Sequence, residues 1–229
     1  KDGNVVATAK HFIGDGATDG GKDQGNALVT QAQMINVHGQ GYYGAIEAGV
    51  QTVMASFNSW QETDDRGALL HDHGKLHGSH FLLTTLLKQH WGFDGLVVSD
   101  WNGVGQVPGC SNSRCAAALN AGIDMVMVPE QWRAFIRDTL DLVDQGEVPL
   151  ARIDDAVRRI LRVKLRAGLF EQPASQGRWA GRVDALDARA LARQAVRESL
   201  VLLKNRGGLL PLRRPARLLV VGKSADSLQ

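Results

Sequence analysis

The chain has 229 residues, of which 44% are hydrophobic and 22% charged, as in an ordinary globular protein, and this composition excludes a disordered chain. No apolar run reaches the roughly 18 residues of a membrane-spanning helix, so we expect no membrane partner. The net charge is only +2. Basic residues prevail after about residue 130, but they alternate with acidic residues on helical faces. We therefore interpret them as a solvated surface and expect no nucleic-acid partner.

Four short apolar runs predict strands, at 5–9, 52–56, 96–99 and 125–128. Helical patterns lie between or after them, at about 30–48, 79–91, 112–121 and 131–145. Strands that alternate with helices predict an α/β fold with a parallel sheet covered on both faces. Such units fit half of a (β/α)8 barrel or part of a doubly wound sheet. Polar residues follow the carboxyl end of each strand, where barrel enzymes build their sites, and this favours the barrel.

Two further helices are predicted at 152–167 and about 187–204, with a linker near 173–178 between them. An apolar run at 217–222 predicts a strand that begins another domain. We expect both ends to be cut from a longer protein, because no signal-peptide core precedes the first strand and little follows the last. The predicted parts are a partial barrel domain, a linker with a connecting helix, and the start of a second domain, at 1–170, 171–208 and 209–229.

The polar segment 61–78 is expected to be a long loop. The segment contains three histidines and is followed closely by a fourth. Together with a neighbouring aspartate they form the set His71, Asp72, His73, His77 and His80. A metal site, with Asp72 as an oxygen ligand, is one interpretation of such a set. The spacing matches no established zinc motif and histidines are common in loops, so we predict no metal and no cofactor.

Cys110 and Cys115 are the two cysteines of the chain. A local disulfide between them would close a surface loop in an oxidising compartment, whereas free thiols would be typical of a reducing one. The sequence leaves both interpretations open.

Asp100 follows the apolar run at 96–99, so its carboxylate is expected at the carboxyl end of a barrel strand, where it would face a site. Trp101 beside it offers a flat apolar wall for the C–H face of a sugar ring. The alternative role of Asp100 is to cap the next helix.

Lys10 and His11 also end a strand, and a glycine-rich loop that carries Asp15 follows them. Two hydrogen-bond donors of this kind suit vicinal sugar hydroxyls. A nucleotide or phosphate site is disfavoured, because the loop lacks the Gly-Lys-Ser/Thr ending of a P-loop. Asp15 is interpreted either as a turn former or as a substrate contact.

Several ordered segments together resemble glycoside hydrolase family 3, namely 10–16, 53–60, 92–101, 121–125 and 199–205. The resemblance covers nearly the whole chain and points to the bacterial exo-1,3/1,4-β-glucanase and β-glucosidase branch, of which this chain would be a central fragment. The β-N-acetylhexosaminidase branch is disfavoured, because its catalytic loop histidine has no counterpart here. The resemblance implies the C-terminal half of a (β/α)8 barrel, followed by the first strand of an α/β sandwich domain.

The resemblance also implies a retaining glycosidase that releases glucose from the non-reducing end of β-glucans or β-glucosides. Asp100 matches the nucleophile that forms the glycosyl-enzyme intermediate. Lys10 and His11 match a pair that binds glucose hydroxyls, Trp101 matches an aromatic side chain beside the nucleophile, and Ser59 lies in a stretch that lines the same pocket. The implied location is periplasmic or secreted.

The chain departs from the family pattern in three ways. The family barrel begins before residue 1, and the glutamate that serves as acid/base belongs to a later domain, beyond residue 229. Segment 61–74 is also longer than its counterpart. The alternative prediction is therefore a truncated, non-catalytic fragment that binds sugar weakly or needs the missing remainder of the same enzyme as a partner.

Overall fold

The computed structural model describes residues 5–171, 173–212, 217–223 and 225. The chain divides into two compact units, Lys1–Ala180 and Gly181–Gln229. Within the described residues, every buried hydrophobic side chain lies between Phe12 and Val163. The hydrophobic core therefore belongs to the first unit.

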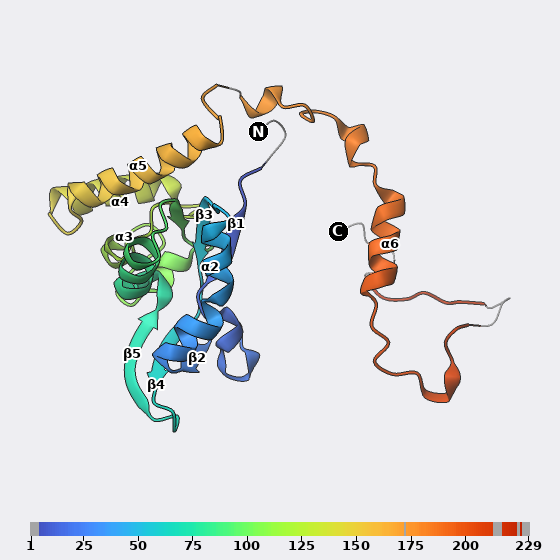
Figure 1. Cartoon of the computed structure of the whole chain (residues 1–229). Helices are drawn as coiled ribbons and strands as arrows, with labels where there is room; N and C mark the ends of the chain where they lie inside the picture. Colours follow the sequence, from blue (N-terminus) through green and yellow to red (C-terminus); the bar gives the residue numbers. More distant parts are fainter. Residues whose placement is uncertain (1–4, 172, 213–216, 224, 226–229) are drawn as a thin grey trace. The chain divides into compact units, whose positions relative to one another are not determined.

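A parallel sheet forms the centre of the first unit (Figure 1). Its strands are β1 (Thr8–Phe12), β3 (Thr52–Ala55) and β6 (Leu96–Val98), neighbours in that order. A parallel bridge between Val98 and Met125 brings the fourth predicted run to the edge of this sheet. The parallel α/β prediction is confirmed, whereas closure into half a barrel stays a prediction.

The first strand begins later than the predicted 5–9, because its partner β3 begins only at Thr52, which pairs with Thr8. Val5 and Val6 precede the paired residues and are exposed. The apolar run at 5–9 thus starts before the residues of β1 that pair with β3.

All six predicted helices are present in some form. The helical segments are α1 (Gln31–Gln33), a π-helical turn (Met34–His38), α2 (Gln40–Glu47), a π-helical segment (Phe81–His90), α3 (Ala116–Ala121), α4 (Trp132–Asp144), α5 (Leu150–Arg166) and α6 (Arg189–Ser199). The helix predicted at 30–48 is therefore broken into three pieces. It starts at a capping box, in which the Thr30 hydroxyl accepts the Gln33 N–H at 3.1 Å.

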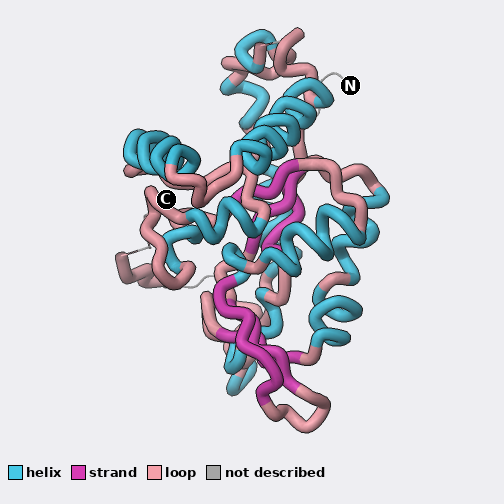
Figure 2. The backbone as a smooth tube through the Cα atoms, turned by 90° about the vertical axis from the view of Figure 1, so that its left-hand side faces the viewer, coloured by secondary structure: helices cyan, strands magenta, loops and turns pink. Residues whose placement is uncertain are grey.

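The prediction of a long loop at 61–78 is wrong. Strands β4 (Ser59–Thr63) and β5 (Leu69–Lys75) form an antiparallel hairpin, and β2 (Asn26–Val29) pairs in parallel with β4. Figure 2 shows the hairpin extending away from the central strands. The carboxylate of Asp64 shapes its turn by accepting the backbone N–H of Ala68 at 2.8 Å. Most of β5 faces solvent, so its residues are largely polar and do not show the apolar pattern by which a strand is predicted.

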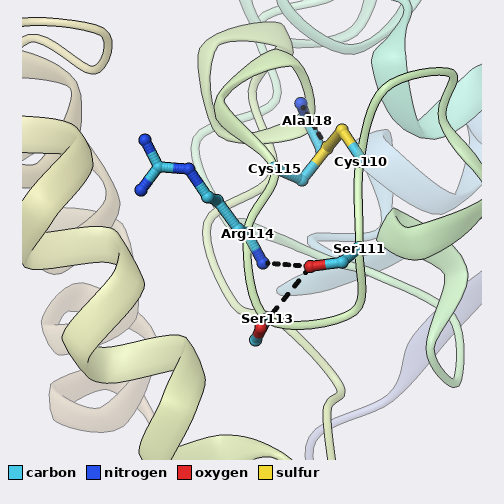
Figure 3. The surroundings of a disulfide bond; sticks show 6 residues. All are labelled: Cys110, Ser111, Ser113, Arg114, Cys115 and Ala118. Atoms are coloured by element: carbon cyan, nitrogen blue, oxygen red, sulfur yellow. Dashed lines mark hydrogen bonds between the residues drawn. A yellow bond between two sulfur atoms is a disulfide. The ribbon is translucent and has the colours of Figure 1, made fainter.

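Cys110 and Cys115 form a disulfide, which decides between the two interpretations that the sequence left open (Figure 3). The hydroxyl of Ser111 accepts the backbone N–H of Arg114 within this small loop. The Arg114 side chain points away from the loop and donates to Glu147 Oε1 at 2.9 Å. Helix α3 begins directly after the loop, which is why it is shorter than the predicted 112–121.

The second unit contains α6, which ends at Ser199, before the predicted limit of 204. The strand predicted at 217–222 is not formed in the described residues 217–223, where Leu218 to Val221 are 69–88% exposed. A strand needs a hydrogen-bonded neighbour and an apolar face to cover, and the described residues provide neither. The domain limits at 170 and 208 stay predictions.

No helix in the described part of the chain combines the length and apolar character needed to cross a membrane.

Candidate active site

Asp100 lies just beyond β6, at the carboxyl end of the parallel sheet. The ladder continues one residue past the strand, where the Ser99 N–H donates to the Met125 carbonyl at 2.9 Å. The next amide, that of Asp100, donates instead to Nε2 of His77 at 2.9 Å. The carboxylate is 17% exposed, and its Oδ1 accepts the Trp101 N–H at 2.6 Å. One oxygen of the carboxylate is thus tied to the backbone.

His11 comes from β1, at the other side of the sheet, and its ring lies between two carboxylates. Nε2 is 3.6 Å from Asp100 Oδ2, and Nδ1 is 3.4 Å from Asp15 Oδ2. A neutral imidazole donates from one nitrogen only, whereas a protonated one donates from both. Asp15, His11 and Asp100 therefore form a row of two carboxyl groups with an imidazole between them, at the carboxyl end of the sheet.

The remaining predicted site residues take different positions. The Lys10 side chain is exposed and makes no hydrogen bond or ion pair with the described residues, and Trp101 is 54% exposed beside Asp100. Both are accessible to a ligand. Ser59 begins β4 in the other sheet, where its N–H donates to the Gly25 carbonyl. The structure gives Ser59 no contact with Asp100, and the roles assigned to these residues stay predictions.

His77 is a site residue whose role the sequence did not predict. It lies in a 3-10 turn, Leu76–Gly78, and is fully buried. Burial lowers the pKa of its imidazole to about 4, although the Asp100 carboxylate acts in the opposite direction. The neutral ring can accept the Asp100 N–H. The sequence could not predict this contact, because it depends on how the hairpin folds.

The other histidines of this segment lie on the hairpin. His73 stacks on Trp60 with ring centroids 3.8 Å apart, and its Nε2 is 2.9 Å from Glu62 Oε2. The His71 ring lies 4.4 Å from that of His73. Across the described ranges, no group of three or more His, Cys, Asp or Glu side chains is placed to hold a metal ion.

A buried ionic cluster fixes the strand that leads to Asp100. The Asp124 carboxylate is fully buried and accepts the Val97 N–H of β6 at 2.8 Å. It also pairs with Lys88, at 2.8 Å, and with Arg152 of α5. Burial lowers the Lys88 pKa to about 8, with Asp124 opposing the change. The cluster joins β6 to two helical segments beneath the site.

The chain resembles known proteins over almost all of its length. It is 32% identical to a periplasmic β-glucosidase of Salmonella typhimurium, an alignment that covers 98% of this chain and 29% of that protein. It superposes with a TM-score of 0.77 on a mutant exo-1,3/1,4-β-glucanase of a Pseudoalteromonas species, at 46% identity over 98% of this chain and 35% of that one.

A β-glucosidase of Listeria innocua, solved as a mutant in complex with laminaribiose, superposes with a TM-score of 0.68 at 27% identity. That match covers 90% of this chain and 28% of that one. The chain thus spans about a third of the length of such relatives. The family model of the glycosyl hydrolase family 3 N-terminal domain matches residues 1–163, which contain the parallel sheet and the site around Asp100. The chain belongs to glycosyl hydrolase family 3.

Proposed function

We propose that this chain carries the nucleophile of a retaining β-glucosidase or exo-β-glucanase, with Asp100 as the attacking group. The observation that carries the proposal is the Asp100 carboxylate at the carboxyl end of the sheet, with Oδ1 bound to the Trp101 N–H and Oδ2 facing His11. Relatives with these activities in their names support β-glucosides as the substrate class. The reaction needs no cofactor.

In the first step, Oδ2 of Asp100 attacks the anomeric carbon. A carbon–oxygen bond to Asp100 forms while the glycosidic bond breaks, and the leaving oxygen keeps the bonding electrons and takes up a proton from an acid. Water then gives one proton to the conjugate base of that acid and attacks the same carbon from the face opposite the Asp100 ester. The carbon–oxygen bond to Asp100 breaks, which releases glucose with retained configuration and frees the carboxylate. Lys10 and His11 supply donors for sugar hydroxyls, and Trp101 supplies a flat surface for the ring.

Retention requires a second carboxyl group about 5–5.5 Å from the nucleophile. We assign this acid/base to no residue of the chain, because none of its glutamates matches the family's acid/base. The periplasmic or secreted location rests on the Cys110–Cys115 disulfide, which is typical of oxidising compartments, and on periplasmic relatives from Salmonella and Dickeya. A Dictyostelium relative is lysosomal, and lysosomal targeting is therefore the competing location.

The test is covalent labelling with 2,4-dinitrophenyl 2-deoxy-2-fluoro-β-D-glucoside. Its leaving group departs without protonation, so the experiment reports on the nucleophile and does not depend on the acid/base. We expect mass spectrometry to find a fluoroglucosyl ester on Asp100, and no label in Asp100→Asn. A label on Asp15 would contradict the assignment. A folded chain that takes up no label would support the alternative of a non-catalytic fragment.

A further inference from the structure

We propose that His77 is a positioning residue, which holds the backbone of Asp100 and thereby aims its carboxylate at the sugar. The inference rests on the proposed function of Asp100 and adds a residue to that site. His77 is fully buried and is not proposed to contact the sugar. It acts through the amide of Asp100, to which it provides the hydrogen-bond acceptor.

The position of this hydrogen bond explains why a side chain is needed. Ser99 donates to the Met125 carbonyl, and Asn102 donates to the Met127 carbonyl at 2.9 Å. Asp100 lies between these two amides, where the chain leaves the sheet. A buried N–H without a partner is strongly disfavoured. His77 supplies the partner from a turn 23 residues away in sequence.

The turn that carries His77 is itself fixed at both sides. The ammonium of Lys75, at the end of β5, donates to the carbonyls of Gln24 and Phe57 at 3.0 Å each. The His77 ring packs 5.8 Å from the Phe57 ring, measured between centroids. Gly103 also packs against the imidazole, because a methyl group added there would overlap the ring. These neighbours confine the ring where its Nε2 accepts the Asp100 N–H.

The hydrogen bond also defines the tautomer. An Nε2 that accepts has no proton, so the neutral ring carries its proton on Nδ1. Nδ1 is buried without a hydrogen bond of regular geometry, and the Ser56 carbonyl lies close enough to affect the ring. Protonation of Nε2 would remove the acceptor and place two donors face to face. A buried, neutral histidine satisfies the role, and a charged one does not.

The test compares His77→Phe, which keeps an aromatic ring but has no acceptor, with His77→Gln, whose amide oxygen can reach the Nε2 position. His71→Phe is the matched control, since it makes the same substitution at an exposed histidine of the hairpin that provides no acceptor to Asp100. Two quantities are measured in the full chain: hydrogen exchange of the Asp100 and Ser99 amides, and the rate of labelling by the fluoroglucoside.

In His77→Phe we expect Asp100 exchange to accelerate at least tenfold while Ser99 stays protected, and labelling at saturating reagent to slow about 100-fold, as expected for a misplaced reacting group. His77→Gln should recover most of the protection and of the labelling rate, and His71→Phe should retain both at the wild-type level. Equal labelling in His77→Phe and wild type would overturn the inference. So would loss of protection at Ser99 and Asp100 together without rescue by Gln, because that pattern reports general loosening.

A wild-type chain that takes no label contradicts the proposed function instead. In that case hydrogen exchange alone tests the role of His77. An unprotected Asp100 amide in the wild-type chain would overturn that role.

Discussion

The His77 imidazole makes the stability of the first unit depend on pH. Burial lowers its pKa from 6.5 to about 4, with the Lys75 charge adding to the decrease and the Asp100 charge opposing it. In the unfolded chain His77 therefore takes up a proton near pH 6.5, whereas in the folded chain it is protonated only near pH 4. The free energy of unfolding should decrease by at most about 3 kcal/mol as the pH falls from 6.5 to 4. Below pH 4 this contribution should stay constant.

Urea unfolding at pH 7 and pH 4.5 checks this prediction, with His77→Gln as the comparison. Acidic residues such as Asp155, whose pKa is lowered by Arg159 and Lys88 against the effect of burial, add their own loss at the lower pH. The difference between the two proteins isolates the histidine. A loss of stability that is equal in both would contradict the assignment to His77.

Gly103 gives a second prediction at the scale of single residues. Gly103→Ala places a methyl group against the His77 ring, so the ring or the 100–103 turn must move. We expect a loss of about 1–3 kcal/mol in unfolding free energy, as for other overpacked sites, together with slower labelling of Asp100. Gly44→Ala in α2 is the control, since its added methyl meets nothing within 4 Å and should be neutral or slightly stabilising. Thermal unfolding and the labelling rate measure both effects.

Part of the site could be predicted from single residues. Asp100, Trp101 and His11 follow or end apolar runs, and the carboxyl ends of parallel strands converge, so their proximity follows from the strand pattern. His77 could not be found this way, because its contact with Asp100 depends on a hairpin that the polar sequence concealed. The position of Ser59 at the start of β4 in the second sheet was also not predicted, and its assignment to the pocket stays a prediction.

At the scale of elements, the junction between β6 and α5 depends on Asp124. Asp124→Asn keeps the side chain's size but leaves the buried Lys88 and the largely buried Arg152 without their anionic partner. Removing one partner of a buried pair typically costs about 3–5 kcal/mol, and we expect a loss in that range. Asp154→Asn is the control, because its pair with Arg158 on the same helix is exposed and should be worth less than about 1 kcal/mol.

Chemical denaturation of the two variants is the measurement. Equal losses in Asp124→Asn and Asp154→Asn would show that the buried cluster does not hold the two elements together.

Elements were predicted well where their hydrophobic period was long. Helices α4 and α5 were found to within a few residues, because their apolar residues recur at helical spacing. The region 30–48 was predicted as one helix but is interrupted by a π-helical turn, Met34–His38. The hairpin was missed since β5 buries little and so shows no regular alternation. Hydrophobic periodicity therefore predicts an element only where apolar residues recur regularly along it.

At the scale of the whole molecule, the two units differ in what stabilises them. Every buried hydrophobic side chain of the described residues lies before residue 164, so the first unit carries the core. The helix and extended segments of the second unit are exposed throughout the residues described there. The assignment of 171–208 to a linker remains a prediction, and limited proteolysis tests it.

We expect trypsin to cut first after Arg178 or Arg182, which lie in exposed turns, and to leave a fragment that starts at residue 1 and unfolds cooperatively. Arg158 is an internal control, because its side chain is 68% exposed, compared with 54% for Arg182, yet lies within α5. Proteases require a locally unfolded backbone, so exposure in a packed helix does not suffice. Mass spectrometry identifies the first cut, and circular dichroism follows the unfolding of the fragment. A first cut at Arg158 would contradict the assignment of 171–208 to a linker. A fragment without a cooperative transition would show that the core requires residues beyond 182.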